Sequence, residues 1–206
     1  MLTAFTAGLL LISISELGDK TFFIAVILAM RHSRKLVFIG VTAALAAMTI
    51  LSVILGRLVS LLPKDIIHYA EIALFIGFGI KLLYDASQMT TVAGDTEVID
   101  EAKAAVEQAE SQLPKQKSDW GIVLEAFVLT FMAEWGDRTQ FATIALAASN
   151  NPIGVTAGAI LGHALCAAIA VIGGKLIAGR LDERQITFIG GCLFLIFGAI
   201  AIVEGA

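Results

Sequence analysis

Two hexapeptides place charged residues inside otherwise apolar segments of this chain. Residues 16–21 read ELGDKT and residues 134–139 read EWGDRT, and each copy carries two carboxylates, one cationic side chain and a threonine. A charged side chain at the centre of a bilayer costs at least ~2.5 kcal/mol on insertion scales. Four carboxylates in such surroundings require compensating charge, which indicates a site that an ion visits.

The charge balance favours a divalent cation or protons as that ion. The candidate metal- and proton-binding residues are Glu16, Asp19, Glu134 and Asp137. Lys20 and Arg138 oppose these four acids, which leaves a formal deficit of two negative charges. Carboxylates and hydroxyls form a hard oxygen site, suited to Ca²⁺, Mn²⁺ or Mg²⁺. Neither copy contains His or Cys, so zinc or copper has little support. Because close carboxylates titrate as a coupled set, metal would exchange for protons.

Several neighbouring residues could support this site. A glycine at the middle of each segment, Gly18 or Gly136, allows either close helix packing or local unwinding, in which freed carbonyls join the coordination. Thr21, Thr139 and Gln140 could add oxygen ligands. Alternatively, each threonine hydroxyl donates to the carbonyl one turn back along a helix. These alternatives remain open at the level of the sequence.

The motif also has a purely structural explanation. On a continuous helix, Glu16 and Asp19 project from one face, and Glu16–Lys20 and Glu134–Arg138 are spaced for intrahelical ion pairs. Two such pairs would pin two helices together. They would leave both aspartates uncompensated, so we favour the ion site.

The composition indicates an integral membrane protein. Of 206 residues, 58% are hydrophobic and 16% charged, against roughly a quarter charged in soluble domains, and the mean hydropathy is +0.87. The net charge of −4 and the lack of a basic run give no indication of nucleic-acid binding. Cys166 and Cys192 lie in apolar stretches without CxxC spacing, so we expect small core residues. His163 is either a proton relay or a packing residue.

The apolar segments predict an all-α membrane protein with six transmembrane helices. A helix needs about 20 largely apolar residues to cross a bilayer. Six segments qualify, at about 3–29, 36–62, 67–86, 120–148, 152–178 and 185–204. The N-terminus lacks the positively charged start of a signal peptide, so we expect the first segment to be retained.

A polar stretch at 87–119 divides the chain. It contains seven acids and three lysines, and its apolar residues fall at helical spacing before Pro114. We therefore expect an acidic loop with an amphipathic helix, serving as a solvated connector or as a regulatory or metal-sensing element. The expected organisation is a three-helix repeat at 1–86, the loop at 87–119 and a second three-helix repeat at 120–206.

The two halves align at an offset of 118 residues. Besides the hexapeptides, Phe23 meets Phe141, Gly40 meets Gly158 and Gly56 meets Gly174. Because each half has an odd number of spans, the second must enter the membrane from the opposite face. The halves then form an inverted repeat, which brings both hexapeptides to the bilayer midplane, where such transporters bind their ions.

The distribution of cationic residues predicts the orientation. With six spans, one side of the membrane holds ten of the 14 lysines and arginines, and the other holds Arg57 and Lys64. By the positive-inside rule the first side is cytoplasmic. The central loop is then cytoplasmic, and both termini lie on the other side.

The doubled motif E-x-G-D-[KR]-[TS], in two three-span halves around an acidic loop, resembles one family. The chain is similar to the Gdt-type cation/proton antiporters, which include Golgi calcium and manganese transporters and manganese exporters of cyanobacteria and chloroplasts. Both copies match in full, at Glu16, Gly18, Asp19, Lys20 and Thr21 and at Glu134, Gly136, Asp137, Arg138 and Thr139. By length and loop character the chain is particularly similar to the cyanobacterial manganese exporter.

The resemblance implies a secondary transporter that moves Mn²⁺ or Ca²⁺ out of the cytosol against protons, with no prosthetic group, in the plasma or thylakoid membrane. Preference for Mn²⁺ comes from the resemblance alone. A passive divalent-cation channel would use the same acids without proton coupling, and an amino-acid-like exporter would need an apolar pocket. A scaffold would tolerate loss of the glutamates. The proton stoichiometry, and the choice between a monomer and a homodimer, are left open by the sequence.

Overall fold

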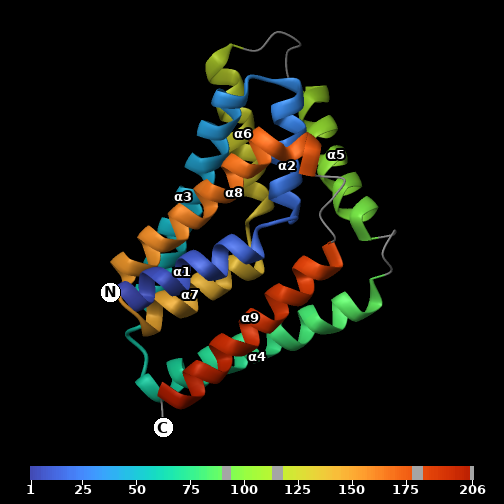
Figure 1. Ribbon diagram of the computed structural model, residues 1–206. Coiled ribbons are helices and arrows are strands. Elements are labelled where there is room, and N and C mark those ends of the chain that lie inside the picture. Colours follow the sequence, from blue (N-terminus) through green and yellow to red (C-terminus); the bar gives the residue numbers. More distant parts are fainter. Residues whose placement is uncertain (90–93, 113–117, 178–182, 205–206) are drawn as a thin grey trace.

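The computed structural model describes residues 1–89, 94–112, 118–177 and 183–204, which form α-helices and no strands (Figure 1). The helices are α1 (Leu2–Ser15), α2 (Lys20–Arg31), α3 (Arg34–Val59), α4 (Lys64–Gln88), α5 (Gly94–Gln112), α6 (Asp119–Ala133), α7 (Arg138–Ser149), α8 (Pro152–Ile177) and α9 (Glu183–Glu204). Within the described residues, α3, α4, α8 and α9 are long and apolar enough to cross a membrane. The protein is therefore an all-α membrane protein.

The two segments that carry the hexapeptides are broken helices, where the sequence predicted continuous helices over 3–29 and 120–148. The first divides into α1 and α2, and the second divides into α6 and α7. Residues 16–19 and 134–137 connect them outside regular helix. The expectation that Glu16 and Asp19 share one helical face is therefore wrong, because α1 ends at Ser15 and α2 begins at Lys20.

Helices from the two halves of the chain pack against each other at glycines. Gly40 of α3 lies against the backbone of α6 at Val123, and Gly158 of α8 lies against the backbone of α1 at Phe5. A methyl group at either glycine would overlap the facing carbonyl oxygen. Both the glycines and their partners are 118 residues apart, so one contact occurs twice. These close approaches fix the positions of the two broken segments.

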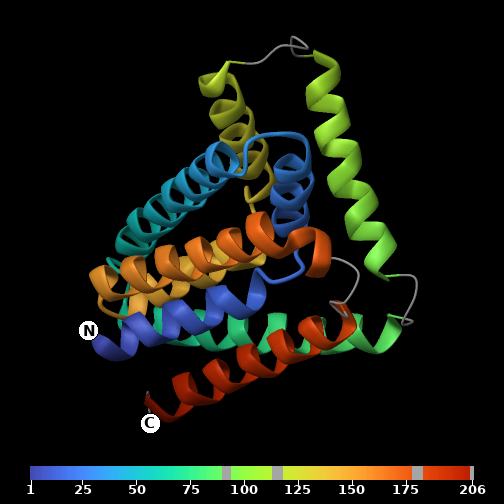
Figure 2. The same cartoon turned by 45° about the horizontal axis from the view of Figure 1, so that its top comes forward.

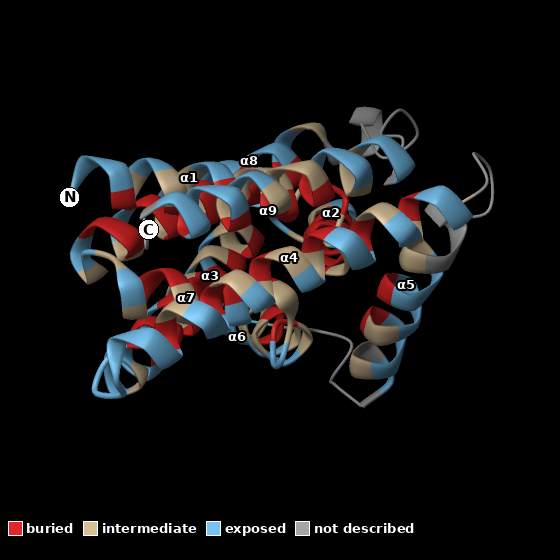
Figure 3. Cartoon of the chain, turned by 90° about the horizontal axis from the view of Figure 1, so that it is seen from below, coloured by how far each residue is buried: buried red, intermediate tan, exposed pale blue. Residues whose placement is uncertain are grey.

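The helices α4 and α9 form a separate pair beside this bundle (Figure 2). Phe75 of α4 packs against Phe194 of α9 with ring centroids 5.8 Å apart. About 28% of the most apolar window of α4 and of α9 is buried, against 50% for α3 and α8. The pair is therefore peripheral, and its outward faces are largely exposed apolar residues (Figure 3).

The helix α5, within the acidic stretch, docks on α2 (Figure 1). Ala102 and Val106 are fully buried against the apolar residues of α2. Glu101 and Glu107 of α5 lie 3.2 and 3.6 Å from cationic groups of α2. The stretch is thus more than a solvated connector in its described part. Pro114, and three of the ten cationic residues assigned to the cytoplasmic side (Lys115, Lys117 and Arg180), lie outside the described residues.

Candidate cation site

Each break in the two helices is built by a glutamate, a glycine and an aspartate in order. Glu16 ends α1, and its carbonyl oxygen accepts a hydrogen bond of 3.3 Å from the N–H of Asp19. Gly18 between them has a φ of 76°, in the left-handed region that side chains with a Cβ avoid. Asp19 then caps α2, since its carboxylate accepts the Lys20 N–H at 2.8 Å.

The second break repeats this arrangement. The carbonyl of Glu134 accepts the N–H of Asp137 at 3.2 Å, and Gly136 has a φ of 82°. Asp137 caps α7 by accepting the N–H of Thr139 at 3.4 Å and its hydroxyl at 3.0 Å. An added Cβ at Gly136 would meet nothing within 4 Å. At Gly18 an added Cβ would meet Ile186 Cδ1 of α9 at 3.3 Å. Both glycines therefore serve the local break through their positive φ, and close helix packing does not explain Gly136.

The motif threonines bind the carboxylates across the breaks. Thr21 donates its hydroxyl to Glu16 Oε2 at 3.2 Å, and Thr139 donates to Glu134 Oε2 at 3.4 Å. Neither hydroxyl donates to the carbonyl one turn back, which was the alternative left open by the sequence. Each threonine instead fixes the glutamate that precedes its own helix.

Three of the four candidate acids meet at one point. Glu16, Glu134 and Asp137 each offer a carboxylate oxygen, and these atoms lie within 4.8 Å of one another. Both glutamates are 2% exposed, and Asp137 is half-buried. A divalent cation needs oxygen ligands at about 2.0 to 2.6 Å, so a small inward movement would let all three reach one ion. We refer to these three residues as the carboxylate cluster.

The fourth acid, Asp19, is paired with a cation. Its Oδ2 lies 3.4 Å from Nη2 of Arg138, across the two breaks. The other motif cation, Lys20, points away and lies 3.2 Å from Glu101 of α5. The intrahelical pairs Glu16–Lys20 and Glu134–Arg138 suggested by spacing are therefore replaced by longer-range pairs, because the helix is interrupted at each motif. With Lys20 directed outward, four acids and Arg138 leave three formal negative charges instead of two.

Gln140 has both ends of its amide engaged. Its Oε1 accepts the N–H of Gly136 at 2.8 Å, and its Nε2 donates to Sδ of Met48 on α3 at 3.0 Å. The orientation follows because a backbone N–H can only donate. Gln140, expected as an oxygen ligand, thus supports the second break. Phe22 occupies the matching position of the first half, so the two breaks are supported differently.

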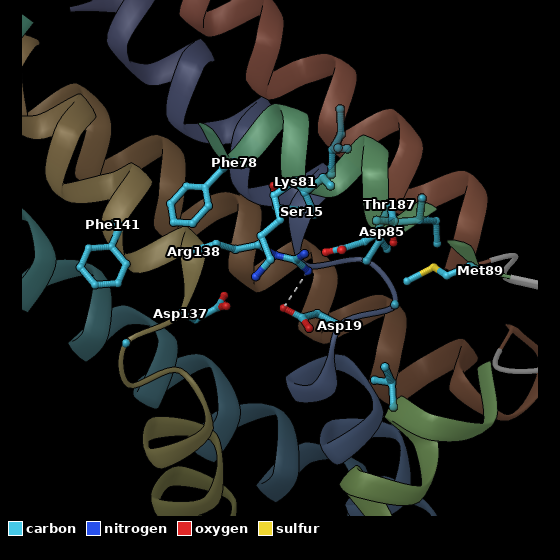
Figure 4. Close-up of a pocket in the computed structure, with 18 residues that line it drawn as sticks. Ser15, Asp19, Phe78, Lys81, Asp85, Met89, Asp137, Arg138, Phe141 and Thr187 are labelled. Carbon is cyan, nitrogen blue, oxygen red and sulfur yellow. Dashed lines mark ion pairs between the residues drawn. The ribbon is translucent and has the colours of Figure 1, made fainter. Parts of the chain in front are cut away.

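A cavity of about 430 Å³ opens beside the breaks (Figure 4). Asp19, Asp137 and Arg138 lie on one side, and Lys81 and Asp85 of α4 lie on the other. The two glutamates do not line this space, whereas Asp137 belongs both to the cavity and to the carboxylate cluster. Lys81 and Asp85 were not among the residues predicted for the site. Two charged residues near the end of an otherwise apolar helix were the feature of the sequence that could have identified them.

His163 and the two cysteines lie outside the cluster. His163 of α8 is 5% exposed, and its Nδ1 has no hydrogen-bond partner in the described part of the chain. Cys166 is buried on α8, and Cys192 on α9 is half-buried; both are free thiols. Neither cysteine belongs to a disulfide, in keeping with the sequence analysis.

The fold and the site together define a class of protein: a helical membrane protein in which two broken helices bring buried carboxylates together. A match to a protein family narrows this class further. The chain belongs to the divalent cation/proton antiporter GDT1 family, whose model matches residues 4–90 and 122–206. The family consists of transporters and not enzymes, as the motif resemblance predicted. The unmatched residues between these blocks include α5.

Cyanobacterial and plant proteins are among the relatives of this chain. The chain is 59% identical over 201 residues to the GDT1-like protein sll0615 of Synechocystis, covering 98% of this chain and 97% of the relative. It is 44% identical over 199 residues to GDT1-like protein 4 of Oryza sativa subsp. japonica, covering 94% and 71%. It is 42% identical over 224 residues to the chloroplastic protein PAM71 of Arabidopsis thaliana, covering 98% and 57%. No solved structure matches the chain.

Proposed function

We propose that this protein exports Mn²⁺ from the cytosol in exchange for protons, with Ca²⁺ as a second substrate. The observation that carries the proposal is the carboxylate cluster, in which Glu16, Glu134 and Asp137 offer oxygens within 4.8 Å of one another. Membership of a divalent cation/proton antiporter family supports the same chemistry. The choice of Mn²⁺ and the outward direction are our proposals.

The exchange follows from competition for the same oxygens. Three ionised carboxylates at this separation repel one another, and either a divalent cation or protons relieve the repulsion. Binding of the cation therefore releases protons from the coupled set, and protonation releases the cation. Because Asp19 is paired with Arg138, it contributes little net charge, and we assign it to positioning and to capture of the ion.

The cavity supplies a route for the cation. It is lined by the last turns of α4, at Asp85 and Met89, and by the first turn of α9, at Ile186. These helix ends adjoin the loops that the positive-inside rule assigns to the cytosol. A cation entering there can reach Asp137, which lines the cavity and also belongs to the carboxylate cluster with the buried glutamates. The direction of loading is thus compatible with export.

We further propose that the halves 1–86 and 120–206 form an inverted repeat of three spans each, with α1 and α2 together, and α6 and α7 together, as broken spans. The repeated glycine contacts between α3 and α6 and between α8 and α1 support this arrangement. The matching breaks support it as well. Non-helical backbone at membrane depth is tolerated where it lines a cavity.

The membrane location and assembly remain proposals. Cyanobacterial and chloroplastic relatives favour a plasma or thylakoid membrane. The termini would lie on the non-cytoplasmic side, and α5 would lie in the cytosol. One copy of the chain supplies the whole carboxylate cluster, so transport by this site requires no second subunit.

Transport by purified protein in liposomes tests the proposal. Liposomes would carry a pH-sensitive dye inside, and Mn²⁺ or Ca²⁺ would be added outside. We expect cation uptake to be accompanied by proton release from the lumen, and Glu16→Gln to abolish both. Cation uptake without proton movement would support a passive channel and overturn the proposal. Uptake of an amino acid with indifference to metal would overturn it in favour of a small-molecule exporter.

A further inference from the structure

The two halves of the chain contain matching helix contacts that differ in polarity. Where α3 packs against α7, three hydroxyl residues are buried: Thr49, Ser52 and Thr143. At the matching positions, 118 residues away, the contact between α8 and α2 has alanines: Ala167, Ala170 and Ala25. All six residues are no more than 3% exposed. We refer to the three hydroxyl residues as the hydroxyl seam, because one contact is lined by hydroxyls and its counterpart is apolar.

Two contacts fix the register of α3 against α7. Nε2 of Gln140 donates to Sδ of Met48 at 3.0 Å. Farther along, a Cβ added at Gly56 would lie 2.6 Å from the carbonyl oxygen of Ile144. Ser52 lies one turn after Met48 and one turn before Gly56, so it faces α7 between these two contacts.

The other two hydroxyls lie on the same faces of their helices. Thr49 precedes Ser52 by three residues, a spacing that keeps two side chains on one side of a helix. Thr143 follows Gln140 by three residues and precedes Ala147, which contacts Gly56, by four. All three hydroxyls therefore belong to the contact between α3 and α7.

The hydroxyls of the seam do not join the two helices. Each donates at 2.8 Å to the carbonyl four residues earlier in its own helix, at Leu45, Met48 and Thr139 respectively. A hydroxyl has one proton and two acceptor lone pairs, so each oxygen still offers acceptor capacity at the contact. The alanines of the α8–α2 contact show that such helices pack without hydroxyls. Helix association therefore does not account for the seam.

The seam and the cavity beside the breaks lie toward opposite ends of α4. The seam starts next to Thr139, whose hydroxyl donates to Glu134, and runs toward Val59, where α3 ends. The helix α4 begins shortly afterwards at Lys64, and its second half lines the cavity as far as Met89. Its 25 residues span about 37 Å at 1.5 Å per residue. The cavity therefore serves one side of the membrane, and the seam leads toward the other.

We propose that the hydroxyl seam is the outward route of the transported ions, an inference that rests on the proposed cation/proton exchange. The buried carboxylate cluster must reach water on both sides in turn, and the seam opens to water on the side opposite the cavity. Cations leave and protons enter along it. Oxygen acceptors suit hydrated Mn²⁺, Ca²⁺ and protons, whereas hydroxyls whose protons are engaged offer no donor to an anion. The apolar α8–α2 contact stays closed.

Labelling of introduced cysteines tests whether the seam opens. Ser52→Cys and Ala170→Cys are a matched pair, because both positions are 1% exposed and are related by the offset of 118 residues. Leu61→Cys, at an exposed position between α3 and α4, marks the side on which the seam ends. A charged, membrane-impermeant methanethiosulfonate would be added on that side of proteoliposomes during Mn²⁺/proton exchange. The wild-type chain, with its two native thiols, gives the background.

We expect Ser52→Cys to react above background and its modification to stop Mn²⁺ uptake, whereas Ala170→Cys should not react. Equal reaction of the pair, reaction of Ala170→Cys alone, or no reaction of Ser52→Cys while Leu61→Cys reacts would overturn the inference. Thr143→Cys and Ala25→Cys form a second matched pair if a variant of the first does not fold. If the wild-type protein moves no cation, the proposed function fails, whereas the labelling still decides whether the seam opens to water.

Removal of the hydroxyls tests their part in transport. The variants are Ser52→Ala, Thr143→Val and their combination. Thr156→Val is the matched control, because the Thr156 hydroxyl makes the same bond, at 2.8 Å to the carbonyl four residues earlier, on α8 and outside the seam. We expect Mn²⁺-driven proton release to slow severalfold in the seam variants and to stay unchanged in the control. An unchanged rate in the combined variant, or equal slowing in the control, would contradict a role for the seam oxygens.

Discussion

Arg138 lies 3.4 Å from Asp19, so the cation of the second hexapeptide neutralises a carboxylate of the first. The residues are 119 positions apart and meet because the two breaks lie close together. Lys20, which occupies the matching position of the first hexapeptide, turns outward to Glu101. The two copies of one motif therefore perform different electrostatic roles. One cation links the breaks, and the other holds α5.

Replacement of either cluster glutamate by glutamine should abolish metal/proton exchange. Glu16→Gln and Glu134→Gln keep the volume but remove the charge that a divalent cation requires. We expect Mn²⁺-driven proton release in proteoliposomes to fall to background while the protein still inserts. Asp100→Asn, at an exposed position of α5, is the control and should transport normally. Full activity of both glutamine variants would rule out the cluster as the site.

Loss of the Arg138–Asp19 pair should destabilise the contact between the two breaks. Both side chains are less than a third exposed, and hydrogen bonds to charged groups contribute about 1.5–3 kcal/mol. We expect Arg138→Gln to lower the melting temperature in detergent and to slow transport, with Arg138→Lys intermediate. Asp19→Asn combined with Arg138→Gln should cost less than the sum of the two single changes, because the pair is lost only once. Additive effects would mean that the two residues do not interact.

Alanine at the two motif glycines should be costly, mainly because of backbone strain. Gly18 and Gly136 have positive φ, and a Cβ in that region costs about 1–2 kcal/mol. An added Cβ meets only Ile186 at 3.3 Å in the first case and nothing in the second. Gly77→Ala is the matched control, since Gly77 lies within α4 in open space and alanine favours helix. Melting temperatures should fall for the first two variants and hold or rise for the third.

Valine in place of the motif threonines should weaken metal binding more than folding. Thr21→Val and Thr139→Val keep the shape of the side chain and remove the hydroxyls that orient Glu16 and Glu134. We expect the Mn²⁺ concentration for half-maximal transport to rise about tenfold, as for other groups that orient metal ligands. The control is Thr6→Val, because the exposed Thr6 hydroxyl donates only to the Leu2 carbonyl of its own helix, and this variant should leave the concentration unchanged.

A charge on the apolar face of α5 should release this helix from α2. Val106 is fully buried, so Val106→Asp would place an unpaired charge in an apolar contact. We expect faster hydrogen exchange along residues 98–109 and faster proteolysis in this stretch. Gln108→Asp, on the exposed face, is the control. Glu101→Gln should have a small effect, because exposed ion pairs contribute about 0–1 kcal/mol.

The sequence by itself determined the chemical type of this protein. Two local properties of the chain were enough. Its apolar segments are long enough to span a bilayer, and two of them contain acids that are too costly there unless something compensates their charge. The offset of 118 residues likewise required no structure, since repetition is visible in the order of residues. The family was predicted from the two hexapeptides and their setting in two apolar halves around an acidic loop, and the family match confirmed it.

Only the tertiary structure decided which of these residues act together. Spacing suggested Glu16 with Lys20, but the helix ends at Ser15, and Lys20 reaches Glu101. Asp19 lies outside the carboxylate cluster. It is paired with Arg138, which belongs to a segment more than a hundred residues away. Ser52 faces α7 because Met48 and Gly56, on the same side of α3, both contact that helix. Hydropathy and periodicity describe each helix along its own axis, and the partners of a buried charge depend on contacts between helices that they do not encode.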